Sequence, residues 1–197
     1  MWLVTRAALA LMAADEGALQ VLRDGVVLEI VPAGRLPLEG IDAYAVRSFT
    51  SCQELASAAA SGGLADVDAV LYDSENWRFT PVEEQVDLVG SMLRAREAAD
   101  AAGVRLIAAP AVSLAKVLPV APGVQPGGIG DNGRGDRYDR YLRAGIATAA
   151  AIADVVDIQA QGAERDPRRY AAFVREATLQ VHAVNPSATI LAGLSTN

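Results

Sequence analysis

Residues 69–77 read Ala-Val-Leu-Tyr-Asp-Ser-Glu-Asn-Trp, an apolar run that ends in two carboxylates two positions apart, Asp73 and Glu75. Alternate residues of a β-strand face the same side, so both acids are expected to project together from the end of a buried strand. Two acids on one face are the usual apparatus of general acid–base catalysis, above all of glycoside hydrolysis. The stretch therefore predicts a sugar-cleaving or sugar-binding site.

Around this stretch, predicted strands alternate with predicted helices. Apolar runs bounded by turn residues predict strands at 26–32, 44–49, 69–75, 104–110, 155–161 and 188–195. Such repetition requires parallel strands with right-handed crossovers. An open doubly wound sheet is the alternative, but no glycine-rich nucleotide fingerprint follows the early strands, and polar strand ends favour a barrel. We predict an α/β fold of the parallel (β/α)-barrel type, a partial or atypical TIM barrel with about six strands.

Helix boundaries are marked by capping residues. Capping boxes predict helix starts at Ser51 and at Thr80, the second with Pro81 at the first helical position. Apolar residues at helical spacing follow the second box and extend the helix toward Gly103: Val82, Val86, Val89 and Leu93. A further helix is predicted to open at Asp166 and to end at Asn185.

The predicted organisation divides the chain at residue 24. A short apolar block follows Arg6, so residues 1–24 are expected to form an N-terminal helix to about Arg23 or a weak signal-like segment. Residues 25–197 are expected to form a single barrel-like domain. Within it, the glycine- and proline-rich residues 119–136 are either a flap over the site or a variable surface loop. The sequence stops directly after a predicted strand, which leaves open an incomplete barrel, a fragment or a homo-oligomer.

Composition and charge argue against several classes of partner. The 197 residues include 24 acidic and 17 basic side chains, and the resulting net charge of −7 repels nucleic acid on average. No apolar run approaches the ~20 residues that span a bilayer. Cys52 is the single cysteine, so no internal disulfide can form. The cytoplasm is favoured over export, which stays open, and the expected partner is a small molecule or an oligosaccharide.

Further polar residues interrupt the predicted strands on one face. They are Glu29, Arg47, Asp157, Gln159 and Gln161. One face of each barrel strand points into the lumen, so we expect this polar set near the upper rim of the lumen. The alternative is a structural ion network, in which Arg47 neutralises Glu29 or Asp73.

Roles within a functional site follow from position. Glu75 is the candidate proton donor, and Asp73 would raise its pKa or orient the substrate. Trp77 is the candidate ring for stacking on a sugar, with a loop anchor as the alternative. The remaining candidate substrate-binding residues are Arg47, Gln159, Gln161 and Asn197.

Other chemistries have weaker support. The single histidine, His182, lies in a predicted helix, so neither a Ser–His–Asp triad nor a histidine metal site is expected. The single lysine, Lys116, is the only Schiff-base candidate. A carboxylate-only Mg²⁺ or Ca²⁺ site on Asp73, Glu75 and Asp157 is an alternative, but we predict a site without metal or cofactor.

Residues 68–75 resemble the strand motif Asp-x-x-Asp-x-Asp-x-Glu of chitinase-type glycoside hydrolases, family 18. Asp68, Asp73 and Glu75 match the motif, and Leu71 stands where the family has its second Asp. The resemblance implies a barrel in which Glu75 donates the proton and Asp73 steers a substrate acetamido group that acts as nucleophile. The Asp-x-Glu pair is also similar to that of family 25 lysozymes. Tyr-Asp-x-Glu-x-Trp, with a terminal Gly-Leu-Ser-Thr-Asn, is similar to uncharacterised barrel-like proteins.

These observations together predict a glycoside hydrolase-like, carbohydrate-active domain with a paired-carboxylate site. The alternative is a non-catalytic carbohydrate-binding or scaffold domain of unknown function, because the same fold supports both.

Overall fold

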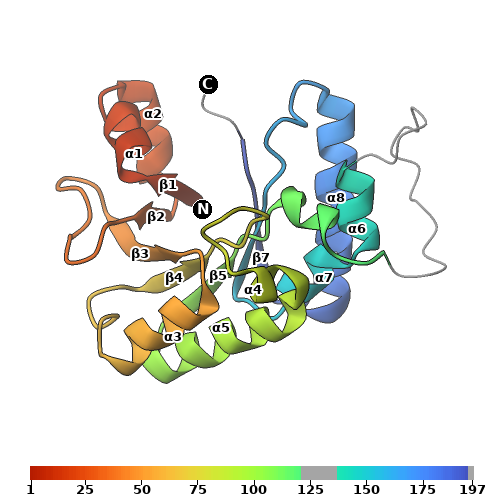
Figure 1. The fold of residues 1–197 in the computed structure, drawn as a ribbon. Helices are drawn as coiled ribbons and strands as arrows, with labels where there is room; N and C mark the ends of the chain where they lie inside the picture. The colour runs from red at the N-terminus through yellow and green to blue at the C-terminus, as the bar shows by residue number, and fades with distance from the viewer. Residues whose placement is uncertain (121–136, 195–197) are drawn as a thin grey trace.

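The computed structural model describes residues 1–120 and 137–194, and its centre is a parallel sheet curved into a nearly closed barrel (Figure 1). The strands lie side by side in chain order and every neighbouring pair is parallel. They are β1 (Trp2–Thr5), β2 (Val27–Ile30), β3 (Ala43–Phe49), β4 (Ala69–Tyr72), β5 (Arg105–Ala108), β6 (Val155–Ile158) and β7 (Thr189–Ala192). The predicted parallel (β/α)-barrel class is confirmed.

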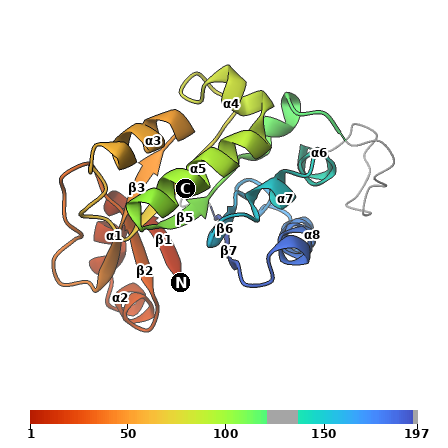
Figure 2. The ribbon, with the colours of Figure 1, turned by 90° about the horizontal axis from the view of Figure 1, so that it is seen from below.

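Helices cover the outer face of this sheet. They are α1 (Arg6–Ala13), α2 (Glu16–Arg23), α3 (Cys52–Ala60), α4 (Val82–Val86), α5 (Leu88–Ala102), η1 (Val112–Lys116, a 3₁₀ helix), α6 (Arg137–Arg143), α7 (Ile146–Ala150) and α8 (Pro167–Val184). Figures 1 and 2 show α3 and α5 side by side along one side of the barrel, and α6, α7 and α8 gathered beside β6 and β7. None of the helices among the described residues has the length and apolar character needed to cross a bilayer.

The sheet has one strand more than the six predicted. β1 pairs in register with β2, from Trp2 beside Val27 to Thr5 beside Ile30. Four residues are too short for a recognisable alternation, and Thr5 is also the residue that caps α1 by accepting a hydrogen bond from the Ala8 amide. The expected single helix to Arg23 is two helices, because Asp15 starts a new one by capping α2.

Alternation along the strands separates two apolar clusters. The lumen cluster consists of Leu28, Val46, Ala69, Leu71, Ile107, Ala109 and Val155, with Leu3, Ile30 and Leu191 against it. The outer cluster packs the opposite strand faces against the helices, and includes Val70 and Tyr72 of β4 and Val156 and Ile158 of β6. The barrel interior is therefore packed with apolar side chains. They form a floor beneath the residues at the carboxyl ends of the strands.

The helix predicted after Thr80 differs from expectation in two ways. It breaks at Asp87, which ends α4 and caps α5 through the Gly90 amide. The valines and leucine at helical spacing face solvent: Val82 is 70%, Val86 55%, Val89 60% and Leu93 46% exposed. Buried positions of α5 are instead mostly small: Leu88, Ser91, Met92, Ala95, Ala98 and Ala99. Alanine gives little contrast in hydrophobic patterning, so the sequence pattern selected the wrong face.

Most of the capping signals are confirmed. Ser51 caps α3 through the Gln53 and Glu54 amides, and Asp166 caps α8, which Asn185 ends. The box at Thr80 is wrong, because α4 is preceded by Pro81 and has no side-chain cap. The Thr80 hydroxyl instead accepts hydrogen bonds from the loop that follows β4.

Candidate functional site

Extended backbone continues past the end of β4, so side chains there keep alternating between the two faces of the sheet. Backbone hydrogen bonds continue past Tyr72, from the Asp73 amide to Phe49 and from the Ala111 amide to Ser74. Extended geometry therefore carries the strand alternation onward, and Asp73 follows Leu71 on the lumen face while Ser74 follows Tyr72 toward the helices.

Asp157 stands level with Asp73 on the lumen face, two strands away. Leu71, Ile107 and Val155 are register partners on β4, β5 and β6, so the residues two positions later also lie level. Those residues are Asp73, Ala109 and Asp157. The two acids thus lie two strands apart at the carboxyl ends of the strands, directly above the apolar lumen floor, which is where (β/α)-barrel proteins carry their active sites.

Gln159 lies one pleat above Asp157 and bridges to β4 and β5. Its Nε2 donates to Asp73 Oδ1 at 2.8 Å and to the Ala109 carbonyl at 2.9 Å. Both hydrogens of the amide are therefore used, and Asp73 is fixed in orientation by a neutral donor rather than by a cation.

Burial raises the pKa of all three acids of this layer, and the Asp73 charge adds to the rise at the other two. Burial raises the pKa of Asp73, which the hydrogen bond from Gln159 partly opposes. Burial and the nearby Asp73 charge raise the pKa of Glu75, and the same two causes raise the pKa of Asp157 to about 6. Asp73, Glu75 and Asp157 form no ion pair with any residue in 1–120 or 137–194. Without a cation, like-charge repulsion and burial favour protonation.

Glu75 sits at the start of a tightly held loop. Its backbone amide donates to Thr80 Oγ1 at 3.1 Å, and its carbonyl accepts from the Trp77 amide at 3.0 Å. Buried Gln85 of α4 donates to the carbonyls of Trp77 and Thr80 at 2.8 and 2.7 Å. The half-buried carboxyl of Glu75 is therefore carried by a loop closed by hydrogen bonds at both ends.

The next residue links this loop to η1 and α4. The Asn76 amide donates to Ser113 Oγ at 3.0 Å, and its side-chain Nδ2 donates to Gln85 Oε1 at 2.6 Å. Thr80, Gln85 and Ser113 were not identified from the sequence. The one sequence signal for Gln85 is that it follows two glutamates in the predicted helix. That pattern does not indicate that its side chain is buried.

Trp77 lies on the same loop as Glu75 and is 38% exposed. Its indole Nε1 donates to Thr80 Oγ1 at 3.0 Å, and its ring meets Phe79 edge-on with centroids 5.0 Å apart. Arg78 lies 4.6 Å from the Phe79 ring centroid. The indole is anchored, yet it presents ring surface to solvent together with Phe79.

Two charged residues expected in the lumen are on the outer face. Arg47 is a register partner of Val70, which belongs to the outer cluster, and its guanidinium donates to the Gly63 carbonyl. Glu29 alternates with lumen-facing Leu28 and is fully buried, with Arg6 Nε at 2.8 Å and the Leu38 amide at 2.6 Å. The suggested pairing of Arg47 with Glu29 or Asp73 is therefore wrong.

Of the remaining predicted site residues, Gln161 has its side-chain amide against Gly193 beyond β7 rather than in a hydrogen bond with the acids. Gln161 is exposed, and its carbonyl accepts from Tyr138. Asn197 lies outside the described residues, as does most of the predicted loop 119–136. Of the residues expected at the rim of the lumen, the structure thus brings together Asp73, Glu75, Asp157 and Gln159.

The sequence leaves open a metal site formed by the carboxylates of Asp73, Glu75 and Asp157. Over the part of the chain that the structure describes, no three His, Cys, Asp or Glu side chains come close enough to share a metal ion. Asp73, Glu75 and Asp157 therefore do not form a ready-made cation site.

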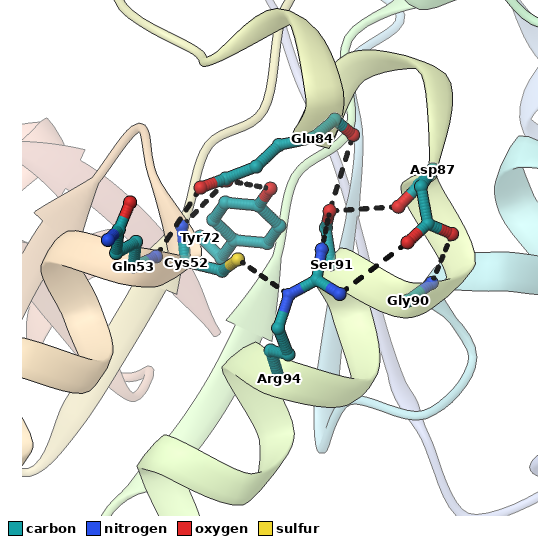
Figure 3. Close-up of polar contacts among 8 residues, drawn as sticks. All are labelled: Cys52, Gln53, Tyr72, Glu84, Asp87, Gly90, Ser91 and Arg94. Atoms are coloured by element: carbon teal, nitrogen blue, oxygen red, sulfur yellow. Dashed lines mark hydrogen bonds and ion pairs between the residues drawn. The ribbon is translucent and has the colours of Figure 1, made fainter.

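A second polar cluster lies on the outer side of β4 (Figure 3). The buried Glu84 carboxylate accepts from Ser51 Oγ and the Cys52 amide at 2.7 Å and from the Tyr72 hydroxyl at 2.8 Å. Burial raises the pKa of the Cys52 thiol, which lies 3.5 Å from Arg94 Nε. A fully hydrogen-bonded carboxylate and a protonated thiol are suited to tying α3, α4 and β4 together.

An open groove of about 1140 Å³ lies outside this cluster, between α3 and α5. Its lining includes Cys52 and Glu84 together with alanines of both helices. Because the polar groups at its floor are engaged with one another, we assign the chemistry to the lumen acids rather than to this groove.

Comparisons with known protein families, curated proteins and solved structures gave no match for this chain. What the structure supports is the barrel-like parallel sheet of seven strands.

Proposed function

We propose that this protein is a carbohydrate-active domain of the glycoside hydrolase type, with Glu75 as proton donor and Asp73 as its partner. The observation that carries the proposal is the acidic layer of Asp73, Glu75 and Asp157 above the apolar floor of the lumen. Burial and the Asp73 charge raise the pKa of Glu75, which favours a protonated carboxyl beside an ionised one. That combination is what cleavage of a glycosidic bond requires.

The chemistry assigns a role to each group. The Glu75 carboxyl gives its proton to the glycosidic oxygen as the bond from that oxygen to the anomeric carbon breaks. Ionised Asp73, oriented by Gln159, stabilises positive charge on the sugar directly or steers a substrate acetamido group. Water then adds to the anomeric carbon and a proton returns to Glu75, which restores the starting state.

The experiment compares wild type, Glu75→Gln and the control Glu39→Gln on aryl glycosides with different leaving groups. Glu39 is an exposed acid in the β2–β3 loop. Loss of a general acid should lower kcat/KM by about 10²–10⁴-fold for a phenyl glycoside. The loss should be much smaller for a dinitrophenyl glycoside, because that leaving group departs without a proton.

Two results would count against Glu75 as the acid. One is residual turnover in Glu75→Gln equal to that of wild type. The other is an equal loss for both leaving groups, which would indicate that the substitution disturbs the site as a whole. The Glu39→Gln variant should retain wild-type values on every substrate.

The exposed Trp77 and Phe79 rings favour a second candidate, sugar binding without turnover. Exposed aromatic faces are suited to stacking on a sugar ring. Under this candidate, wild type binds an oligosaccharide without hydrolysing it, and Trp77→Ala loses that binding while Glu75→Gln retains it. Calorimetric titration with oligosaccharides, followed by chromatography of the recovered sugar, separates the two candidates.

A further inference from the structure

A small pocket of about 240 Å³ lies between η1 and α6. Its lining is Val112, Ser113, Ala115, Lys116, Arg137 and Arg140. Pockets for drug-sized molecules occupy about 300–1,000 Å³, so this one suits a single substituent rather than a whole oligosaccharide. Three of its six lining side chains are cationic.

The three cations of the pocket have no carboxylate counterpart among residues 1–120 and 137–194. Elsewhere in those ranges, arginines such as Arg6 and Arg96 form ion pairs. Lys116, Arg137 and Arg140 form none. Scarcity of acids is not the reason, because the chain has 24 acidic and 17 basic residues. Arg137 and Arg140 also repel each other, being three positions apart on one helix.

One of the guanidinium groups is held in place. Arg137 Nη2 donates to the Tyr138 hydroxyl at 2.6 Å, and the guanidinium carbon lies 4.7 Å from the centre of the Tyr138 ring. The same hydroxyl donates to the Gln161 carbonyl at 3.1 Å, which fixes the ring. An oriented guanidinium with hydrogens to spare is the usual partner of carboxylate, phosphate and sulfate oxygens.

The pocket is joined to the candidate acid by a short chain of contacts. Ser113 lines the pocket, and its Oγ accepts the amide of Asn76 at 3.0 Å. Asn76 directly follows Glu75. The wall of the pocket and the loop that carries Glu75 are therefore in direct contact.

We propose that this pocket binds the anionic group of an acidic saccharide, so that the substrates of the neighbouring carboxylates are anionic carbohydrates. The inference rests on the proposed function. A net charge of −7 repels an anionic ligand on average, and a local cluster of Lys116, Arg137 and Arg140 supplies the attraction that brings its anionic end to one place. The shared chemistry is an anionic oxygen group, either a uronic acid carboxylate or a phosphate ester.

The test is calorimetric titration of three proteins with glucuronate, glucose 6-phosphate and glucose at low salt. The proteins are wild type, Lys116→Gln/Arg140→Gln, and the charge-matched control Arg23→Gln/Arg35→Gln, whose arginines are exposed on α2 and in the β2–β3 loop. Wild type and control should bind at least one anionic sugar at least fivefold more tightly than glucose. The pocket variant should lose at least fivefold in affinity for that sugar and keep the wild-type melting temperature.

A loss below fivefold in the pocket variant, or no preference for anionic sugars in wild type, overturns the inference. The two anionic sugars tell a carboxylate site from a phosphate site. Failure of the proposed function has a different signature, because binding of the anionic sugar then persists while Glu75→Gln leaves hydrolysis unchanged. Conversely, hydrolysis of neutral glycosides that depends on Glu75 and is unchanged in Lys116→Gln/Arg140→Gln refutes the anionic pocket. That result leaves the proposed function standing.

Discussion

Gln159 Nε2 lies 2.8 Å from Asp73 Oδ1, although the two residues are 86 positions apart in the sequence. The contact spans from β6 to β4 and passes over β5, where the same amide binds the Ala109 carbonyl. One neutral side chain thus holds a lumen carboxylate in orientation without neutralising it.

Replacing Gln159 with leucine should raise the pKa of Asp73, because the hydrogen bond from Gln159 opposes the rise caused by burial. The variant should also lose roughly 1–3 kcal/mol of unfolding free energy, since a buried carbonyl and a carboxylate lose their donor. Carbon-13 titration of the Asp73 carboxyl and urea unfolding measure the two effects. Gln53→Leu, at an exposed position of α3, should leave both unchanged. An unaltered Asp73 titration in Gln159→Leu would contradict this role.

Asp157→Asn should stabilise the protein above pH 6. The folded-state pKa of Asp157 is raised from 3.8 to about 6, so the folded state holds a proton that the unfolded state releases. Stability from this group is present below pH 3.8 and is lost as the pH rises to about 6. The gain at pH 7.5 should approach but not exceed about 3 kcal/mol.

The measurement for Asp157→Asn is urea unfolding at pH 4 and at pH 7.5, with Asp66→Asn as an exposed control. The variant should gain stability relative to wild type at the higher pH only. Equal stability of the variant and wild type at both values would show that the Asp157 carboxylate is not destabilised in the folded state.

Glu84→Gln should flatten the loss of stability in acid. Burial alone would raise the pKa of Glu84, but hydrogen bonds from the Cys52 amide, Ser51 and Tyr72 outweigh it and hold the pKa below 4.5. The stability contributed by the carboxylate is therefore present above pH 4.5 and is lost as the pH falls through the folded-state pKa.

Melting temperatures at pH 6 and pH 3 test the role of Glu84. Wild type and the exposed control Glu39→Gln should lose more between the two values than Glu84→Gln does. A steeper acid dependence in Glu84→Gln than in wild type would refute the direction of the Glu84 shift.

Arg6→Met should destabilise the protein more than Arg6→Met combined with Glu29→Gln. Removing Arg6 leaves the fully buried Glu29 carboxylate with the Leu38 amide as its one remaining partner in residues 1–120 and 137–194. Because Arg6 is 35% exposed and water can partly replace it, we expect roughly 2 kcal/mol rather than the 3–5 typical of a buried pair. Chemical denaturation measures the difference, and exposed Arg35→Met is the control. If the double variant is the less stable of the two, Glu29 has another compensating partner.

The barrel could be predicted because each of its units carries a local signal. The predicted helix boundaries at Ser51, Gly103, Asp166 and Asn185 are confirmed, because each depends on local chemistry. The wrong boundary at Thr80 and the missed helix start at Asp15 show the limit of such signals. Thr80 has the residue type of a cap, but its hydroxyl is used by the Glu75 and Trp77 groups that only the folded loop brings near.

The candidate site was predictable in part. Gln159 could be assigned to the lumen because polar and apolar residues alternate along 155–161, and Asp73 because it lies two positions after Leu71 of an apolar strand. Arg47 and Glu29 could not, since strands buried on both faces do not reveal which face a charged residue occupies. The side chains of Arg47 and Glu29 point to the helix-covered outer face of the sheet. On that face, the buried Glu29 carboxylate accepts a hydrogen bond from Arg6 at the start of α1.

By itself, the sequence determined the parallel strand–helix repeat and the pair of acids at the end of the fourth strand, because strand alternation and helix capping are local effects. The tertiary structure decided which acids meet. Asp157 joins Asp73 only through the register of β4, β5 and β6, and Lys116 joins Arg137 and Arg140 only because η1 packs against α6. The burial and the charge around these residues come from side chains that are distant in the sequence. No local sequence pattern predicts which distant side chains will be neighbours.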